Sequence, residues 1–484
     1  MTETTHTYRS TIPVAVDALH AWHASPGALQ RLTPPWLGVR ILQEGGITNG
    51  QTARLRVPVA GPFRFTWQLV HEPLTDGLGF VDIQQSGPFR SWRHEHRFET
   101  AGDASSVLED RLTYDLPLGS AGDMVAGDRV SRRLDELFAF RHRRTRIDLA
   151  RHAAAPAAPL HIAITGATGL VGSRLVAFLR SGGHTVSRVV RRPTGAADEI
   201  AWDPARGEID TRALEGLDAV VHMAGATIGS WPWSERRKTV IRDSRVDGTD
   251  LLARTLAGLH APPKVLVSTA AVGWYGSRDD DILTESAAPG SGFLASVCRE
   301  WEAAARPAAD AGIRVVHPRF GVVMAGEGGM LPLVAKVFQA GIGGPLGDGR
   351  QYFAWIGLDD LLGVLLESIV NPALEGPINA VAPQATTNAD FTRALGKVLR
   401  RPTLFRAPAF AIRALTGDMG EDVILTSQRV VPTRLAEHGF HFAFPTIETA
   451  LRHELGQSFG HPEVDAATML TQSTPSPIRT RDTA

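Results

Sequence analysis

Apolar and polar residues alternate along much of the first 116 residues, a pattern typical of β strands that bury one face. The segments with this alternation are residues 8–14, 51–57, 63–71, 79–85, 90–98 and 106–116. In residues 128–149 the period changes, because Val130, Leu134 and Phe138 fall at helical spacing. Arginines, Arg144 among them, occupy much of the rest of this segment, and we interpret them as a solvated face. The pattern predicts an antiparallel sheet followed by one long helix.

After residue 159 the alternation gives way to short apolar runs separated by helical segments. Runs at 160–164 and 185–190, and apolar strands within 218–225 and 265–276 that end in small residues, are spaced like the strands of a parallel sheet that helices cover on both faces. We therefore expect an α/β chain: an N-terminal α+β domain, a Rossmann-type parallel-sheet domain and a small C-terminal substrate-side subdomain. The expected bounds are 1–150, an Ala/Pro-rich linker at 151–159, then 160–400, 401–460 and a disordered Thr/Ser/Pro-rich tail at 461–484.

The charge balance and the cysteine content exclude some classes of partner and location. Fifty Lys and Arg residues balance 51 Asp and Glu residues, so there is no global positive charge to favour nucleic acid as a partner. The single cysteine, Cys298, excludes intramolecular disulfides and fits a reducing compartment. No apolar run reaches the roughly 18 residues of a spanning helix, and the first nine residues are polar. These features predict a cytoplasmic protein without an integral membrane segment.

A glycine-rich turn follows the apolar strand at 160–164. The sequence TGATGLVG at 165–172 leads into a helical segment at 173–181, and its three glycines are spaced three residues apart. This spacing allows a tight turn, a close approach to a pyrophosphate, and close helix–strand packing. The predicted cofactor-binding residues of this turn are Gly166, Thr168, Gly169, Leu170, Val171 and Gly172.

The residues at the end of the second strand of the parallel sheet indicate which cofactor to expect. An NAD site places an acidic residue at the end of this strand to bind the ribose hydroxyls, but here the strand ends in Arg191 and Arg192. Two guanidinium groups suit a 2'-phosphate, so we expect NADP(H) rather than NAD(H). Small residues at the end of the next run, Ala224 and Gly225, would let the dinucleotide lie across the sheet.

Several segments together resemble one enzyme superfamily. Residues 218–225 and 265–276 are similar to the fourth and fifth strand regions of extended short-chain dehydrogenase/reductases. Residues 233–246, 293–305, 317–321, 343–347 and 355–361 narrow the resemblance to epimerase-family proteins that end in a small domain of unknown function. The resemblance implies a nucleotide cofactor near Pro318, a small-molecule substrate, and an oxidoreductase or epimerase-like activity.

The catalytic pair that the resemblance implies is missing. In that superfamily a Tyr-x-x-x-Lys pair exchanges the proton, but none of the four tyrosines has a lysine four residues later. We expect Thr269 or Tyr275 to replace it, with an arginine lowering the pKa of Tyr275; the alternative is a tyrosine that only packs in a loop. Arg245 stands where such enzymes usually carry an asparagine, and Arg350 lies in a glycine-rich loop on the substrate side. Arg242, Arg245 and Arg319 would suit an anionic substrate or would pair with Asp243, Asp359 or Asp360.

The N-terminal segments resemble a second family. Residues 21–36 and 86–98 are similar to the polyketide cyclase and coenzyme Q carrier type of START-like (SRPBCC) domains. The resemblance implies a helix-grip fold with an apolar ligand between sheet and helix. His94 and His96 share one face of a strand and could ligate a metal, but no third ligand is evident, so we interpret them as surface histidines.

Two functions are consistent with these observations. One is an NADP(H)-binding oxidoreductase or epimerase-like enzyme with atypical acid/base residues and a fused apolar-ligand pocket. The other is a non-catalytic, NADPH-responsive binding protein that senses redox state, which the missing Tyr/Lys pair favours. The sequence leaves the substrate and the number of subunits open.

Overall fold

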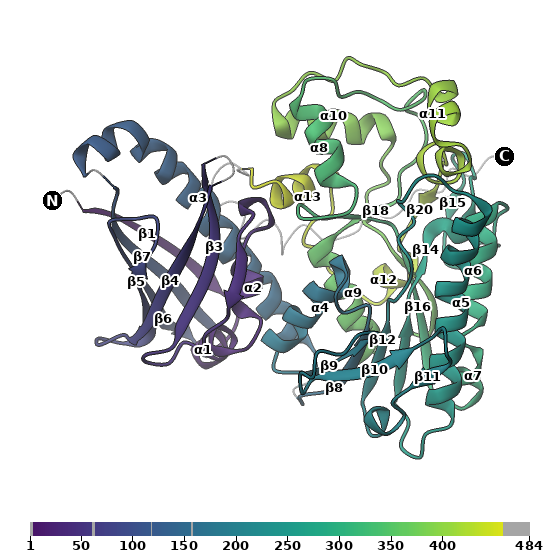
Figure 1. Ribbon diagram of the computed structural model, residues 1–484, viewed down its shortest axis with the longest axis horizontal. Coiled ribbons are helices and arrows are strands. Elements are labelled where there is room, and N and C mark those ends of the chain that lie inside the picture. The colour runs from purple at the N-terminus through teal and green to yellow at the C-terminus, as the bar shows by residue number, and fades with distance from the viewer. Residues whose placement is uncertain (1–2, 61–62, 118, 156–157, 458–484) are drawn as a thin grey trace.

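The computed structural model describes residues 3–60, 63–117, 119–155 and 158–457. Seven strands in the order β1-β7-β6-β5-β4-β3-β2 form an antiparallel sheet in the N-terminal part, residues 3–155 (Figure 1). These strands are β1 Thr4–Ile12, β2 Arg40–Gln43, β3 Thr52–Ala60, β4 Phe63–Pro73, β5 Leu78–Ser86, β6 Ser91–Gly102 and β7 Ser105–Asp115. The six strands expected from the alternation are confirmed. The short β2 was missed, because three of its four residues are exposed and none is buried.

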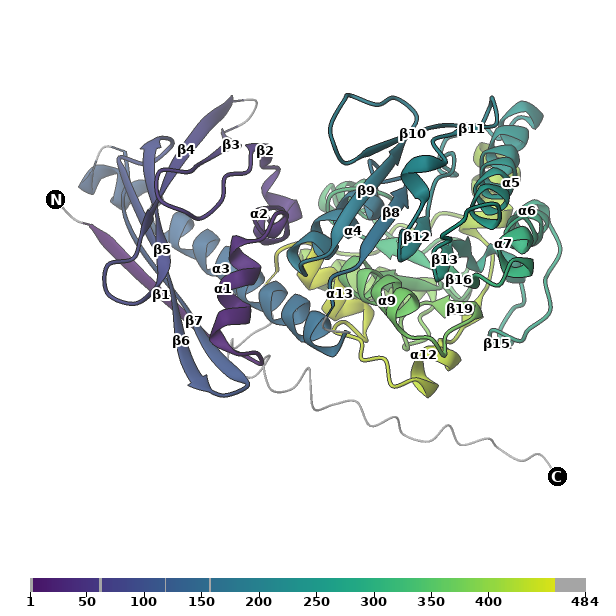
Figure 2. The same ribbon diagram turned by 90° about the horizontal axis from the view of Figure 1, so that it is seen from below.

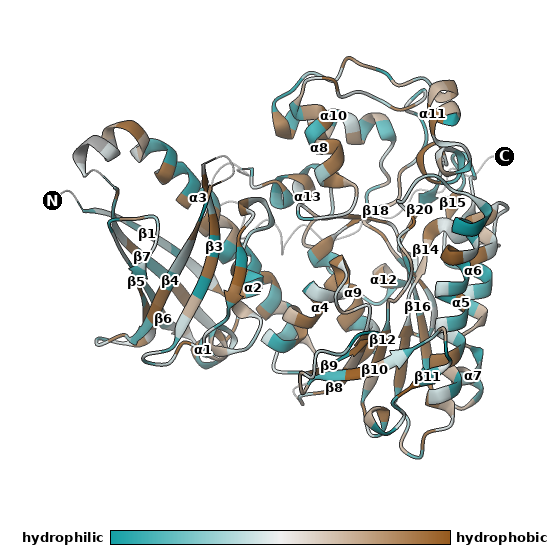
Figure 3. Cartoon of the chain, viewed as in Figure 1, coloured by the Kyte–Doolittle hydropathy of each residue, from teal (hydrophilic) through white to brown (hydrophobic). Residues whose placement is uncertain are grey.

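A long helix crosses one face of this sheet. Helix α3, Ser120–Ala154, packs Phe138 face to face on Tyr8 with ring centroids 4.4 Å apart. Its first turns project beyond the sheet and expose Met124 and Val125 (Figures 1 and 3). The expected linker start at residue 151 is wrong, because α3 continues four residues further and Arg151 forms an ion pair with Asp360. Two shorter helices, α1 Val16–Ala24 and α2 Ala28–Leu32, precede β2.

The parallel-sheet part, residues 158–457, contains the predicted βα units. Its main sheet has the order β11-β10-β9-β8-β12-β13-β16-β14, with β19 beside β16, and only the β10–β11 pair is antiparallel. The strands are β8 His161–Thr165, β9 Thr185–Val190, β10 Glu199–Asp203, β11 Glu208–Ile209, β12 Ala219–His222, β13 Val265–Ser268, β14 Ala270–Ala271, β16 Arg314–Phe320 and β19 Gly376–Ala380. Every residue of β12 and β13 is buried, as expected for strands covered on both faces.

Helices cover the two faces of this sheet and form two apolar cores. Alternate side chains of β8 and β12 pack on one face against α4 and α9, and on the other face against α5 and α7. The bounds of these helices are α4 Leu170–Ser181, α9 Leu358–Val370, α5 Glu235–Ala257 and α7 Arg306–Asp310. A further helix, α6 Phe293–Ala303, lies beside α5 (Figure 1). Within the described residues, no helix combines the length and the apolar character that a membrane span requires.

Much of the chain after residue 320 forms a third layer above the carboxyl ends of the strands (Figure 1). Its elements are β17 Val322–Met324, α8 Leu331–Gln339, β18 Trp355–Gly357, α10 Asn388–Leu399, α11 Ala409–Thr416, β20 Arg429–Val430 and α13 Ile447–Glu454, and β20 pairs with β15 Ile282–Leu283. Helix α12, Thr433–Glu437, lies instead beside β19, where Arg434 donates to the Pro377 carbonyl oxygen at 3.0 Å. Helix α13 packs against α10, so residues on both sides of the expected boundary at 400 share one apolar cluster. The expected tail at 461–484 lies outside the described residues.

The N-terminal part is docked on helix α4. Figures 1 and 2 both show α2 beside α4, and the two helices are in contact. Gly27, directly before α2, has φ +91°, and a Cβ there would lie 2.5 Å from the Ala177 carbonyl oxygen. Only glycine permits this close approach.

A buried carboxylate joins three distant segments at this interface. Asp359, at the start of α9, accepts hydrogen bonds from Arg31 of α2 at 2.8 Å and from Arg144 of α3 at 3.0 Å. His453 of α13 lies 2.9 Å from the second oxygen, and Arg31 also pairs with Asp148. Burial alone would raise the pKa of Asp359, but the two arginines hold it well below its usual range. The solvated-face interpretation is therefore wrong for Arg144, and the expected pairing of Asp359 with arginines of the substrate side is wrong as well.

Replacing this carboxylate tests its contribution. We expect Asp359→Ala to lower the free energy of unfolding by about 3–5 kcal/mol, because it leaves Arg144 buried without its ion-pair partner. Asp250→Ala, which removes an exposed ion pair with Arg254 on α5, is the matched control and should cost less than about 1 kcal/mol. Chemical denaturation of both variants measures the difference. Equal losses would show that Asp359 does not hold the interface.

Glu454 at the same interface predicts a dependence of stability on pH. Burial, together with nearby Asp359, raises the pKa of Glu454 to about 8. The folded chain therefore keeps a proton that the unfolded chain, with a usual glutamate pKa near 4.5, has released. This contribution to stability is present below pH 4.5 and is lost as pH rises toward 8, by up to about 1.4 kcal/mol per pH unit.

Glu454→Gln mimics the protonated form, so we expect it to flatten the fall in the free energy of unfolding between pH 5 and 8. The exposed Glu437→Gln is the control and should leave that slope unchanged. Urea denaturation at several pH values measures both slopes. An unchanged slope in Glu454→Gln would contradict the assignment.

Candidate nucleotide-binding site

The glycine turn lies at the carboxyl end of β8, and two of its glycines are required by the protein's own backbone. Gly166 has φ +69°, and a Cβ there would lie 2.9 Å from the Met223 carbonyl oxygen. A Cβ on Gly172 would lie 2.2 Å from the Gly166 carbonyl oxygen, so only glycine lets α4 approach the turn this closely. The expected tight turn and close helix–strand packing are both present.

The middle glycine has a different environment. Gly169 has φ −79°, and its Cβ would meet only the Gly166 carbonyl oxygen, at 3.2 Å. Gly169 is also the N-cap of α4, and no side chain caps the first N–H groups of this helix. Thr168 is exposed beside it, and Leu170 and Val171 open the helix. The backbone here is open to a group from outside, as pyrophosphate binding at a helix N-terminus requires.

Thr165 fixes the neighbouring strand end against this turn. Its hydroxyl oxygen accepts hydrogen bonds from the backbone N–H groups of Met223 at 3.0 Å and Ala224 at 3.1 Å. This places Ala224 and Gly225 directly beside Gly166. The two small residues predicted from the sequence therefore lie next to the glycine turn, where a dinucleotide would cross the sheet.

Arg191 and Arg192 lie at the same edge of the sheet. Strand β9 runs parallel to β8, with Val189 opposite Thr165, so the two arginines follow β9 where the glycine turn follows β8. Both are exposed, and within the described chain neither forms an ion pair. Arg188, three residues earlier, is by contrast held by Asp198. Two unpaired guanidinium groups one strand away from the turn are available to an anion.

Tyr275 does not have the expected environment of an acid/base group. It is fully buried in the 3₁₀ turn Val272–Tyr275, and its hydroxyl donates to Asn379 Oδ1 at 2.7 Å and accepts from Arg319 at 2.9 Å. Burial raises the pKa of Tyr275, and this effect outweighs the opposing charge of Arg319. The expected lowering of its pKa is therefore wrong, and the geometry agrees with the alternative of a packing tyrosine.

Thr269 also has an internal partner. Its hydroxyl donates to the carbonyl oxygen of His222 at 3.0 Å, and its side chain is buried. This bond connects the end of β13 to the end of β12. A substrate contact by Thr269 stays a prediction.

The arginines of the substrate side fall into two groups. Arg319 makes a two-pronged ion pair with Glu302 at 2.8 and 2.9 Å, and Arg242 pairs with Asp243 and Glu300, so these charges are already matched. The expected pairing with Asp243 is confirmed for Arg242 alone.

Arg245 and Arg350 form no ion pair within the described chain. Arg245 is buried on α5, donates to the Ile241 carbonyl oxygen, and would contact a Cβ on Gly225 at 3.2 Å. Its guanidinium lies over Trp301, 5.0 Å from the ring centroid. Arg350 is exposed in the loop between α8 and β18, and Pro318 is buried within β16. Arg245 is thus a buried cation without a carboxylate, beside Ala224 and Gly225.

Sequence reasoning missed the loop that covers the start of α4. A Cβ on Gly328 would lie 3.0 Å from a Leu170 methyl carbon, and Glu327 of the same loop forms an ion pair with Arg174 on α4. Arg174 also donates to the Gln30 carbonyl oxygen of the N-terminal part. The only signal in the sequence is the small-residue run AGEGG at 325–329, which does not indicate a partner.

Comparisons with known proteins agree with this geometry. The profile of the NAD dependent epimerase/dehydratase family matches residues 162–379, and that of a domain of unknown function matches residues 407–454. An epimerase family protein of Mycobacterium tuberculosis is 42% identical over 290 residues, which cover 60% of this chain and 96% of the relative. The chain belongs to the NAD dependent epimerase/dehydratase family.

Two solved structures extend the comparison. A nucleoside-diphosphate sugar epimerase of Corynebacterium glutamicum is similar along 96% of this chain and 97% of its own, with 31% identity and a TM-score of 0.77. The human epimerase family protein SDR39U1, solved with NADPH, covers 61% of this chain and 99% of its own, with 32% identity and a TM-score of 0.56. The parallel-sheet part is thus shared with this human protein, and the N-terminal part is included in the similarity to the Corynebacterium protein.

The close contact at Gly172 predicts a specific loss of stability. We expect Gly172→Ala to lower the free energy of unfolding by about 1–3 kcal/mol, because the new methyl group overlaps the Gly166 carbonyl oxygen. Gly248→Ala in α5 is the matched control: its Cβ would meet nothing nearer than 3.6 Å, so the substitution should be neutral or stabilising by up to about 1 kcal/mol. Chemical denaturation compares the two variants. A neutral Gly172→Ala would contradict this packing.

Proposed function

We propose that residues 160–400 bind NADP(H) and that the protein is an oxidoreductase of the epimerase family acting on a small-molecule substrate. In this proposal the pyrophosphate lies against Gly169 and the start of α4, and the 2'-phosphate contacts Arg191 and Arg192. Their exposed, unpaired guanidinium groups at the end of β9 carry the preference for NADP(H) over NAD(H). The NADPH bound to the human relative supports the choice of cofactor.

The cofactor would supply hydride exchange with a carbonyl or alcohol group of the substrate. We propose that this chain's residues hold that group rather than deliver a proton from a tyrosine. The buried Arg245, without a carboxylate partner in the described chain, would donate hydrogen bonds to an oxygen at the reacting end. Arg350, exposed in the loop above, would contact an anionic group of the substrate. No described contact favours the alternative of a redox sensor.

For the N-terminal part, we propose a START-like helix-grip domain spanning residues 1–150. Support comes from the seven-stranded antiparallel sheet and the long helix α3 against one of its faces. Aromatic side chains from both elements, such as Trp92, Tyr114 and Phe138, pack in one apolar cluster between sheet and helix, the environment that an apolar ligand would need. We further propose a cytoplasmic location, because the one cysteine, Cys298, is free and buried.

Titration with the two reduced cofactors tests the proposed function. We expect the double variant Arg191→Ala with Arg192→Ala to bind NADPH about 10–100-fold more weakly, because it loses charge-assisted hydrogen bonds to the 2'-phosphate. Its affinity for NADH should stay within about twofold of the wild type, because NADH lacks that phosphate. Cofactor fluorescence measures both affinities.

The control is Arg206→Ala, an exposed arginine in the β10–β11 turn, which should change neither affinity. A parallel loss of NADPH and NADH binding in the double variant would contradict the 2'-phosphate contact. A wild-type protein that binds neither cofactor would contradict the nucleotide site itself.

A further inference from the structure

A cluster of histidines and carboxylates fills the space between the N-terminal sheet and α3. Asp82 of β5, His94 and His96 of β6 and Asp110 of β7 point to the same side of the sheet, and all four are buried. The interpretation of His94 and His96 as surface histidines is therefore wrong, since they are 1% and 4% exposed. The sequence alone did not indicate a third ligand, because Asp82 lies 12 residues before His94 and belongs to the neighbouring strand.

The distances within this cluster are those of metal ligands. Asp82 Oδ2 lies 3.5 Å from His94 Nδ1 and 3.4 Å from His96 Nε2, and ligand atoms of all three residues fall within 4.8 Å of one another. These separations are long for charge-assisted hydrogen bonds, which run at about 2.7–2.9 Å. The two separations from Asp82 Oδ2 match the distance between neighbouring ligand atoms around a tetrahedral zinc ion. That distance is about 3.4 Å when the bonds to zinc are about 2.1 Å long.

The opposite ring nitrogens of both histidines face a second carboxylate. His94 Nε2 lies 2.8 Å and His96 Nδ1 lies 2.9 Å from Asp110 Oδ1. Metal-binding histidines usually present the ring nitrogen away from the metal to such a group, which fixes the ring and makes it a better ligand. On the other side of Asp82, its Oδ1 lies 2.9 Å from His71 Nε2.

The outer layer of the cluster is also organised. His142 of α3 lies 2.7 Å from Asp110 Oδ2 through Nε2 and 2.9 Å from the Ser10 hydroxyl through Nδ1. Through His142, helix α3 therefore positions Asp110, the carboxylate that faces the two ligand histidines. This layered order is typical of a built metal site rather than of scattered buried histidines.

Charge balance gives a further argument. The cluster buries two carboxylates, Asp82 and Asp110. Within the described chain, no arginine or lysine lies at hydrogen-bond distance from the oxygens of either carboxylate. The ring centroids of His94 and His96 lie only 3.9 Å apart, so both rings border the same small space as the carboxylates. A divalent ion in that space would be matched in charge by the two carboxylates.

We propose that Asp82 Oδ2, His94 Nδ1 and His96 Nε2 bind one divalent transition-metal ion, with Zn²⁺ as the favoured ion. Two imidazoles and one carboxylate leave a fourth position for water or an oxygen of a ligand held between sheet and helix. Asp110, His71 and His142 act as positioning residues. The N-terminal part is then a metal-binding domain, which goes beyond the proposed NADP(H) site and does not depend on it.

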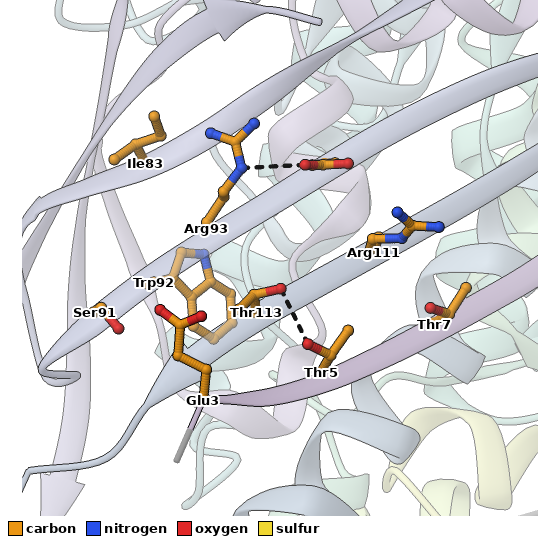
Figure 4. A pocket seen from close by; sticks show the side chains of 10 residues that line it. Glu3, Thr5, Thr7, Ile83, Ser91, Trp92, Arg93, Arg111 and Thr113 are labelled. Carbon is orange, nitrogen blue, oxygen red and sulfur yellow. Dashed lines mark hydrogen bonds and ion pairs between the residues drawn. The ribbon is translucent and has the colours of Figure 1, made fainter. Parts of the chain in front are cut away.

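Among the described residues, the other face of the same strands offers no comparable site. There Arg93 pairs with Glu95 at 3.1 Å, and Thr5 bonds Thr113 at 3.3 Å, around an open polar hollow on the outer surface (Figure 4). Because side chains alternate along β6, Arg93 and Glu95 face out while His94 and His96 face in. Metal binding by the chain is therefore expected on the inner face.

The test uses the full-length protein without a histidine tag. We expect elemental analysis of the protein loaded with Zn²⁺ and then desalted to give about one ion per chain, and Co²⁺ added to stripped protein to give the visible absorption of a low-coordinate nitrogen and oxygen site. Zn²⁺ should also raise the thermal midpoint of the wild type. A wild-type protein that retains no ion and shows no Co²⁺ absorption would overturn the proposal.

Two variants locate the ion. Asp82→Asn should abolish the Co²⁺ absorption, and Asp110→Asn should weaken Zn²⁺ binding by about 10–100-fold, as loss of a supporting carboxylate does. The matched controls are the exposed pair Asp103→Asn and His260→Gln, which should bind as the wild type does. Wild-type affinity in both Asp82→Asn and Asp110→Asn would overturn the assignment of the site. Circular dichroism of the stripped variants verifies that they fold.

Discussion

The buried carboxylate of Asp359 is the constraint on which the arrangement of the chain depends. It stands at the first turn of α9, against the parallel sheet, yet the arginines that neutralise it come from α2 and α3 of the N-terminal part. A buried charge without its partner is strongly destabilising, so the N-terminal part cannot leave this face without exposing or stranding the group. As a result α2 stays packed on α4, the helix that begins at the glycine turn. The N-terminal part therefore contacts the helix that begins at the nucleotide site.

How much could be predicted from the sequence depends on the distance between partners along the chain. The glycine turn and the parallel strands were predictable, because adjacent residues determine a tight turn and a buried apolar run. Arg144 was misinterpreted because its partner Asp359 lies 215 residues away. His94 and His96 were misinterpreted because their common neighbour Asp82 becomes visible only when the pairing of β5 and β6 is known. For Tyr275 the neighbouring cation was foreseen, but the extent of burial that outweighs it was not.

The arginines show how the same residue type serves opposite purposes in this chain. Arg31, Arg144 and Arg319 are buried and form ion pairs with carboxylates, so their charges hold segments of the chain together. Arg191 and Arg350 are exposed and unpaired within the described chain, and they lie on the side of the sheet where the strands end. Because the chain has only four lysines, arginine composition alone does not separate these roles. The presence or absence of a carboxylate partner does.

The environments of Tyr275 and Arg245 suggest how the site could work without the tyrosine–lysine pair. A proton-transferring tyrosine needs access to substrate and a lowered pKa, and Tyr275 has neither, because burial and two hydrogen bonds fix it inside the fold. Arg245, which has no carboxylate partner among the described residues, instead places a positive charge against Gly225, where burial makes that charge costly. An oxygen of the bound substrate that carries negative charge would relieve this cost. The proposed reaction centre therefore depends on a cation that stabilises the negative charge developing on this oxygen, and the proton that the oxygen gains on reduction would come from water.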